Sequence, residues 1–223
     1  VLENLYKDAG SLIGIPEIEK MLQEYKGELT KSFDQRFPGG NYLTGKNLLM
    51  YETALYTIDK FLKSEKSLIK EKGVINILGL EEKVEKEVTL NTSVGEIKLR
   101  IKGLIDRIDQ VGGVTRVIDY KTGKVDKLAF NGKWESVPSY QLQLMVYLYL
   151  YDSEAEVVSG MISFKGLSKG LQTLSIQKME TFEKVWVDNE FKEEFEQYLQ
   201  RFVEEVLSSD FEHNPASRYC VLC

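Results

Sequence analysis

The stretch KGLIDRIDQVGGVTRVIDYKTGK, residues 102–124, constrains the fold more than any other part of the chain. Two β-type runs, 99–109 and 114–120, flank the pair Gly112-Gly113. Both positions of a two-residue hairpin turn need backbone angles that glycine adopts without a Cβ clash. We therefore expect an antiparallel hairpin here, and a domain built around a sheet.

Two aspartates occupy this hairpin where apolar side chains would be expected. Asp106 lies within the first run, and Asp119 lies near the end of the second, two residues before Lys121. A carboxylate in a sheet is costly to bury unless it is paired or holds a metal. Side chains alternate along a strand, so Asp119 and Lys121 share a face. This pattern favours a divalent-metal site, and a structural pair salt-bridged to Arg107 and Lys121 is the alternative.

Hydrophobic periodicity predicts a helical first third, a β-rich centre and a mixed remainder. Apolar stripes predict helices over 1–9, 16–37, 44–72, 138–151 and 178–207. Strand-type runs outside the hairpin cover 74–78, 84–90, 157–164 and 171–176. The order predicts an α/β domain with a central mixed sheet flanked by helices. We divide the chain into a helical region (1–73), a core (74–207) and a tail (208–223).

Composition restricts the class of protein. Hydrophobic residues make up 43% of the 223 residues and charged residues 29%, as in an ordinary globular protein. The chain has neither an apolar run of the ~18 residues a membrane span needs nor a signal peptide. We therefore expect a cytoplasmic protein with no membrane partner. The net charge of −6 argues against non-specific coating of nucleic acid, although it leaves room for a local basic groove.

The motif string then points to a family. GLIDRID, followed by IDYKTGK and by QLMVY at 143–147, resembles the PD-(D/E)XK nuclease superfamily, and especially its RecB/AddB-like branch. The resemblance covers about residues 74–176. It implies a restriction-endonuclease-like fold and a Mg²⁺- or Mn²⁺-dependent deoxyribonuclease. It also implies DNA as substrate, a helicase domain or subunit as partner, and a place in double-strand-break repair.

The resemblance assigns roles residue by residue. Asp106, Asp119 and the backbone carbonyl of Tyr120 would bind the metal. Lys121 would lie beside the attacking water and the scissile phosphate. Gln143 and Tyr147, one helical turn apart, would brace the site or the DNA backbone. Phosphodiester hydrolysis needs a neutralised phosphate, an activated water and a stabilised leaving oxygen, all of which Mg²⁺ can supply.

Both ends of the chain suggest a longer protein. Family members carry a histidine in a G-x-x-x-H phrase just before a segment that resembles VLENLYKD, so we expect this ligand upstream of Val1. His213 lies in the tail and cannot replace it by position. In AddB-like and CRISPR-type members, a C-x-x-C such as Cys220 to Cys223 is half of a [4Fe–4S] site. Two thiolates cannot hold a cluster, so we expect one only in the longer protein.

Other readings stay open beside the nuclease. A catalytically silent DNA-binding or scaffolding module of the same fold is one, and a CRISPR-adaptation-type nuclease is another. Glu81 is either a solvated strand residue or part of the site.

Two further pairs are expected at the surface. We interpret Arg107 and Asp109 as ion pairs on the sheet surface. We interpret Phe130 and Trp134 as exposed aromatics of a loop over 122–137, which either stack on bases or cap the sheet.

Overall fold

The computed structural model describes residues 1–151, 153, 156–178, 181–185 and 188–210. Within them the helices are α1 (Leu2–Ala9), α2 (Ile15–Arg36), α3 (Gly45–Lys72), α4 (Ser139–Tyr151) and α5 (Asn189–Ser208). The strands are β1 (Leu12–Ile13), β2 (Ile75–Thr92), β3 (Gly95–Val111), β4 (Val114–Lys121), β5 (Ala129–Phe130), β6 (Val157–Ser163), β7 (Leu171–Thr173), β8 (Ser175–Lys178) and β9 (Thr181–Lys184).

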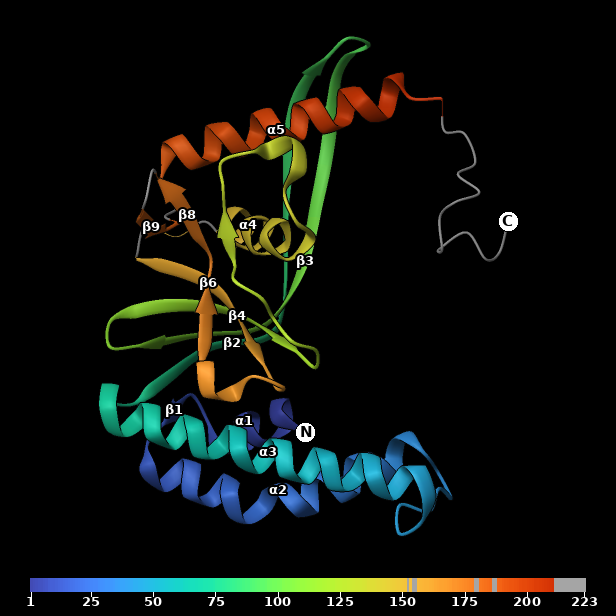
Figure 1. Cartoon of the computed structure of the whole chain (residues 1–223), viewed down its shortest axis with the longest axis vertical. Coiled ribbons are helices and arrows are strands. Elements are labelled where there is room, and N and C mark those ends of the chain that lie inside the picture. Colours follow the sequence, from blue (N-terminus) through green and yellow to red (C-terminus); the bar gives the residue numbers. More distant parts are fainter. Residues whose placement is uncertain (152, 154–155, 179–180, 186–187, 211–223) are drawn as a thin grey trace.

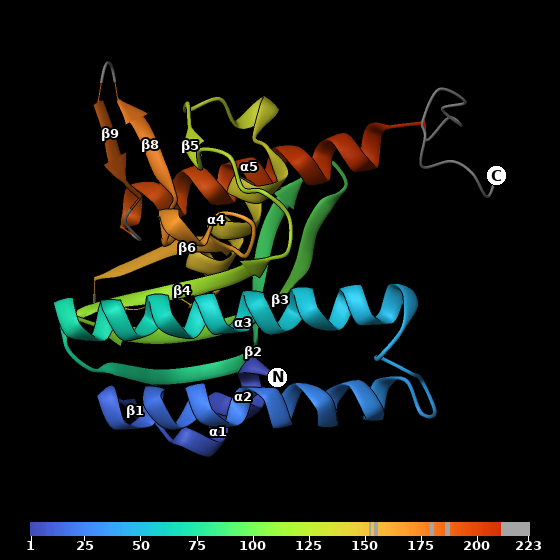
Figure 2. The same ribbon diagram turned by 60° about the horizontal axis from the view of Figure 1, so that its bottom comes forward.

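A mixed sheet of six strands, in the order β1-β2-β3-β4-β6-β7, forms the centre of the molecule. Neighbouring strands are antiparallel except β4 and β6, which are parallel. A parallel pair needs a crossover connection, and the segment that connects β4 to β6 contains α4. Helices α1, α2 and α3 lie on one side of the sheet, and α4 and α5 lie on the other with the small sheet β5-β8-β9 (Figure 1 and Figure 2). The predicted α/β fold with an N-terminal helical region is confirmed.

Each face of the sheet has its own apolar core. The core under the N-terminal helices includes Leu5, Ile18, Phe61, Leu62 and Ile118. The core under α4 and α5 includes Ile105, Val117, Leu144, Leu148 and Phe195. Val117 and Ile118 are consecutive and fall in different cores because side chains alternate along a strand. Both faces of β4 are therefore buried, and Thr115, Arg116 and Asp119 are buried along with its apolar residues.

The hairpin predicted at Gly112-Gly113 is present. Val111 pairs with Val114 across a two-residue turn, and the φ angles of the two glycines are 59° and 85°. Positive φ at both positions is what a tight turn between twisted strands requires, and glycine adopts it at little cost. The turn therefore fixes the register between β3 and β4, the strands that carry the two aspartates.

The strands predicted at 74–78 and 84–90 are one continuous strand, β2. The pairing of β2 with β3 shifts by one residue between Ile77 and Gly79. Glu81 lies just beyond this irregularity with a φ of 51°. The charged residues 81–83, between the two predicted strands, belong to β2. Their side chains are exposed to solvent, so charge does not prevent them from pairing with β3.

The long helix predicted from residue 178 was wrong at its start. Strand β9 occupies Thr181–Lys184, and α5 begins only at Asn189. Asp188 is the N-cap, and its Oδ1 accepts a hydrogen bond of 2.8 Å from the Phe191 N–H. Aspartate at this position satisfies a free backbone donor and marks the helix start.

The expected surface position of Phe130 and Trp134 is also corrected. Phe130 is 2% exposed and Trp134 9% exposed, and their rings contact each other at 4.9 Å between centroids. Trp134 also packs against Tyr198 of α5. These aromatics belong to the core beneath α5, so they do not form a surface for stacking on bases.

The tail and the helices bear on two further expectations, the iron–sulfur site and the absence of a membrane span. Cys220, Cys223 and His213 lie outside the described residues. None of the helices in the described ranges is long and apolar enough to cross a membrane.

Candidate metal and catalytic site

The two predicted metal ligands lie where β3 and β4 separate. The last backbone pair between these strands joins Arg107 to Ile118. One residue further, Asp106 and Asp119 stand on strands that no longer pair. The Tyr120 N–H donates to Asp106 Oδ2 at 2.7 Å instead of to a backbone carbonyl. The two carboxylates thus lie just past the end of the β3–β4 ladder.

Asp119, Lys121 and Gln143 form one hydrogen-bonded group on the α4 face of the sheet. Gln143 Nε2 donates to Asp119 Oδ1 at 2.8 Å, and Lys121 Nζ donates to Gln143 Oε1 at 3.0 Å. Lys121 Nζ also lies 2.9 Å from Asp119 Oδ2. The predicted shared face of Asp119 and Lys121 is confirmed by this ion pair. Gln143 thus bridges the carboxylate of Asp119 and the ammonium group of Lys121.

Tyr147 fixes Gln143 from one helical turn away. Its hydroxyl accepts from Gln143 Nε2 at 2.8 Å and donates to the Leu104 carbonyl at 2.8 Å. The close approach of α4 to β3 depends on Gly103, where an added Cβ would lie 3.2 Å from Tyr147 Cε1. The structure therefore joins Asp119, Lys121, Gln143 and Tyr147 directly, with Asp106 at the neighbouring position of β3.

Burial changes the proton affinity of two of these groups. Partial burial raises the pKa of Asp106, and the charges of Asp119 and Glu81 act in the same direction. The hydrogen bond from Tyr120 and the charge of Lys121 oppose this rise. Burial also raises the pKa of the Tyr147 hydroxyl, so it retains its proton as a hydrogen-bond donor. A cation between the carboxylates would relieve their mutual repulsion.

The backbone direction of β4 turns a third oxygen toward β3. The Lys121 carbonyl accepts from the Phe164 N–H at 2.9 Å, on the β6 side of the strand. Successive carbonyls along a strand point to opposite neighbours, so the Tyr120 carbonyl points toward β3. The Tyr120 N–H, on that same side, already reaches Asp106. The carbonyl position predicted for a metal ligand is therefore consistent with the strand geometry.

The available donors fit a hard divalent cation. Asp119 Oδ2 is buried and accepts no hydrogen bond within the described residues, so it is free to coordinate once Lys121 moves aside. In those same residues, no group of three or more His, Cys, Asp and Glu side chains is placed to hold a metal. Mg²⁺ is bound through one or two carboxylates and keeps several waters. Two aspartates and one carbonyl match that requirement.

Glu81 lies near the site and outside this group. It belongs to β2, between Leu80 and Glu82, which pair with Arg107 and Ile105 on β3. Its side chain is exposed, and its φ is positive. The solvated and the functional interpretation of Glu81 both remain predictions.

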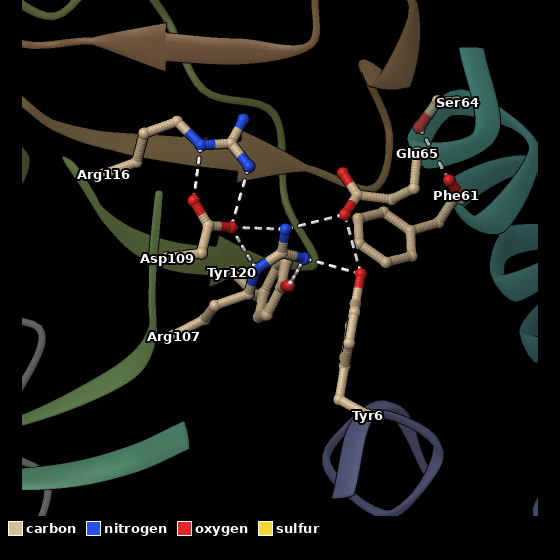
Figure 3. A network of polar contacts seen from close by, with 8 residues as sticks. All are labelled: Tyr6, Phe61, Ser64, Glu65, Arg107, Asp109, Arg116 and Tyr120. Atoms are coloured by element: carbon tan, nitrogen blue, oxygen red, sulfur yellow. Dashed lines mark hydrogen bonds and ion pairs between the residues drawn. The ribbon is translucent and has the colours of Figure 1, made fainter. Parts of the chain in front are cut away.

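A buried polar network lies on the other face of β3 and β4 (Figure 3). Arg107 and Asp109 are wholly buried, so their predicted placement on the sheet surface was wrong. Arg107 Nε donates to Asp109 Oδ2 at 2.5 Å, and Arg116 Nε donates to Asp109 Oδ1 at 2.6 Å. Helices α1 and α3 cover this face of the sheet. Alternation along a strand shows which side chains share a face, but it does not show whether a distant helix covers that face.

The helical region contributes two further members to this network. Arg107 Nη2 lies 2.7 Å from Glu65 Oε2 of α3. Arg107 Nη1 donates to the Tyr6 hydroxyl of α1 at 2.6 Å and to the Tyr120 hydroxyl at 3.0 Å. Burial raises the pKa of both phenols, so they keep their protons. The sequence signal that could have revealed the network is the row of polar residues at alternate positions of β3 and β4.

Comparisons with known proteins show the family of the chain. The sequence model of the PD-(D/E)XK nuclease superfamily matches residues 1–223. The chain belongs to the PD-(D/E)XK nuclease superfamily. A search of curated proteins found no match. One solved structure, titled "Crystal structure of SSO0001", is 21% identical with a TM-score of 0.34 and covers 93% of this chain and 80% of that chain. A likeness at that score carries no argument about function.

Membership in the PD-(D/E)XK superfamily gives the carboxylate group a chemical context. Its members are typically nucleases and generally use divalent metals such as Mg²⁺. In this chain, the D-x-K element is Asp119, Tyr120 and Lys121 at the end of β4. The nuclease fold predicted from the motif string is thus confirmed at the level of the superfamily.

Proposed function

We propose that the chain is a divalent-metal-dependent deoxyribonuclease domain that hydrolyses phosphodiester bonds. The observation that carries this proposal is the hydrogen-bonded group of Asp119, Lys121 and Gln143, beside Asp106, where β3 and β4 separate. It combines a cation-binding pair of carboxylates with a positive charge at the same place. That combination suits a substrate with a negatively charged reacting centre.

Each side chain has a distinct task in this account. Asp106, Asp119 and the Tyr120 carbonyl would hold Mg²⁺ or Mn²⁺. The bound cation would supply charge neutralisation at the phosphate and a reactive water near neutral pH. Lys121 would place its ammonium beside the scissile phosphate, where it balances the charge that develops on the equatorial oxygens.

Gln143 and Tyr147 position the groups that act on the substrate. Gln143 holds Lys121 through its amide oxygen and Asp119 through its amide nitrogen. Tyr147 holds the amide of Gln143. The orientation of the reacting groups is thereby set before the substrate arrives, which lowers the reorganisation needed in the transition state.

The motif string supports a narrower assignment. GLIDRID, IDYKTGK and QLMVY together favour a RecB/AddB-like exonuclease that works with a helicase domain or subunit in cytoplasmic DNA repair. In that assignment a histidine upstream of Val1 would add a metal ligand. A [4Fe–4S] cluster would use Cys220 and Cys223 with cysteines supplied outside this chain.

Cleavage of linear DNA tests the proposal. We would assay the chain, and a version extended upstream, with Mg²⁺ or Mn²⁺ in wild-type, Asp119→Asn and Lys121→Ala forms. Lys98→Ala is the matched control, because Lys98 is exposed on the β2–β3 ribbon away from the site. We expect cleavage in the wild type and the control and at least about a hundredfold loss in the two site variants. Cleavage at wild-type rates in both site variants, or none in any extended form, would reject the proposal in favour of a silent module.

A further inference from the structure

Strand β4 is tied to β3 by side chains at the place where the backbone ladder has ended. The last ladder pair is Arg107 with Ile118. Beyond it, Tyr120 is linked to β3 twice: its N–H donates to Asp106 at 2.7 Å, and its hydroxyl accepts from Arg107 at 3.0 Å. The first link lies at the carboxylates and the second on the opposite face. Tyr120 is thus held from both sides of the sheet.

The guanidinium of Arg107 is itself fixed from several directions (Figure 3). Asp109 binds it from the same strand, Glu65 from α3, and the Tyr6 hydroxyl from α1. The guanidinium also lies 4.6 Å from the centre of the Tyr6 ring. Because Arg107 is wholly buried, it has no alternative solvent partner. Its position is therefore set by the packing of the N-terminal helices.

The charges of the network are balanced. Arg107 and Arg116 face Glu65 and Asp109, so two cations meet two carboxylates in a buried region. A buried ion network of this kind keeps its geometry only when all partners are present. The tie to Tyr120 thus rests on the ion pairs that Arg107 makes with Glu65 of α3 and Asp109 of β3.

We propose that Arg107 is a positioning residue for the metal site, acting through the Tyr120 hydroxyl to hold the end of β4 against β3. At that strand end Asp106 and Asp119 occupy opposite positions on β3 and β4, and the Tyr120 N–H donates to Asp106. Glu65 of α3 holds the guanidinium of Arg107 by an ion pair, so the helical region is a structural part of the site. The metal component of this inference rests on the proposed function.

Two tyrosine variants separate positioning from simple stability. Tyr120→Phe and Tyr6→Phe each remove one hydroxyl bonded to Arg107, and only the first lies on a strand that carries metal ligands. Amide exchange at residue 120 of the metal-free protein reports on the strand end directly. The Val117 amide, within the paired part of β4, is the internal reference for global stability. Calorimetric titration with Mn²⁺ reports on the metal site.

We expect exchange at residue 120, relative to Val117, to rise about tenfold in Tyr120→Phe and to stay within about threefold in Tyr6→Phe. We expect the Mn²⁺ dissociation constant to rise about fivefold or more only in Tyr120→Phe. Equal exchange ratios and equal Mn²⁺ affinities in both variants would overturn the inference. Absence of Mn²⁺ binding in the wild type would contradict the proposed function instead, and the exchange ratio would still decide whether Arg107 positions the strand.

Discussion

Lys121 and Gln143 are joined by a hydrogen bond of 3.0 Å that connects the end of β4 to α4. The same glutamine donates to Asp119 at 2.8 Å, so one amide orients both the cationic and the anionic member of the D-x-K element. An amide can accept from the lysine through its oxygen and donate to the carboxylate through its nitrogen at once. The position is therefore sensitive to the chemistry of the side chain as well as to its size.

Replacing Gln143 with methionine tests this bridging role. Gln143→Met preserves length and helix propensity and removes all three hydrogen bonds of the amide, to Lys121, Asp119 and Tyr147. We expect Mn²⁺ affinity to fall about tenfold or more, as when the supporting partner of a metal ligand is lost. Gln200→Met is the control, because the Gln200 side chain donates to the Asn91 carbonyl near the end of β2, away from the site. Equal affinity in the two variants would show that Gln143 does not orient the site.

Removal of Asp109 tests the energetic weight of the buried network. Asp109→Ala leaves Arg107 and Arg116 without a shared partner in a buried region, so we expect the free energy of unfolding to fall by about 3–5 kcal/mol. Glu85→Ala removes a comparable partner of Arg100 at the surface, where both side chains are more than half exposed. We expect that control to cost less than about 1 kcal/mol. Urea denaturation measures both, and similar losses would contradict the account.

Gly160 lies where β6 meets the edge strand β7. An added Cβ would stand 2.5 Å from the Gln172 carbonyl oxygen, so the backbone of one strand would have to move. We expect Gly160→Ala to lower the free energy of unfolding by about 2–3 kcal/mol. Gly27→Ala is the opposite case, because its Cβ would meet no atom within 4 Å on helix α2. We expect this control to stabilise by about 0.5–1 kcal/mol, and a stabilising Gly160→Ala would refute the packing.

The raised pKa of Asp106 predicts a pH dependence of stability in the metal-free protein. Partial burial makes the folded chain bind this proton more tightly than the unfolded chain. The free energy of unfolding should therefore fall as the pH rises from the pKa of Asp106 in the unfolded chain, about 3.9, through its raised pKa in the folded chain. Asp106→Asn removes this contribution. As the pH rises through that range, the free energy of unfolding of the variant should therefore increase relative to that of the wild type. Urea midpoints in the presence of a chelator measure the difference, and parallel pH profiles would be the contrary result.

The hairpin and the shared faces of the site residues could be predicted from local signals, whereas the resemblance to the PD-(D/E)XK superfamily supplied the roles of Gln143 and Tyr147. Gly112-Gly113 fixes the turn, and alternation places Asp119 and Lys121 on one face. The spacing of Gln143 and Tyr147 on a helix gives their shared face. All of these depend on neighbours within a few residues, and the structure brings the predicted groups together.

The surroundings of the site could not be read in the same way. Arg107 and Asp109 look like surface charges until α1 and α3 are known to cover that face. Phe130 and Trp134 look like loop residues until α5 is known to pack over them. Burial by an element distant in the chain leaves no local periodicity, so tertiary packing decides these positions.

Titration of the chain with Mn²⁺ by calorimetry, wild type against Asp119→Ala, tests the central claim most directly. The account predicts binding in the wild type that disappears in the variant, because Asp119 supplies the carboxylate that Gln143 and Lys121 hold in place. Binding of equal strength in both proteins would place the metal elsewhere. It would contradict the assignment of Asp106 and Asp119 as the metal site.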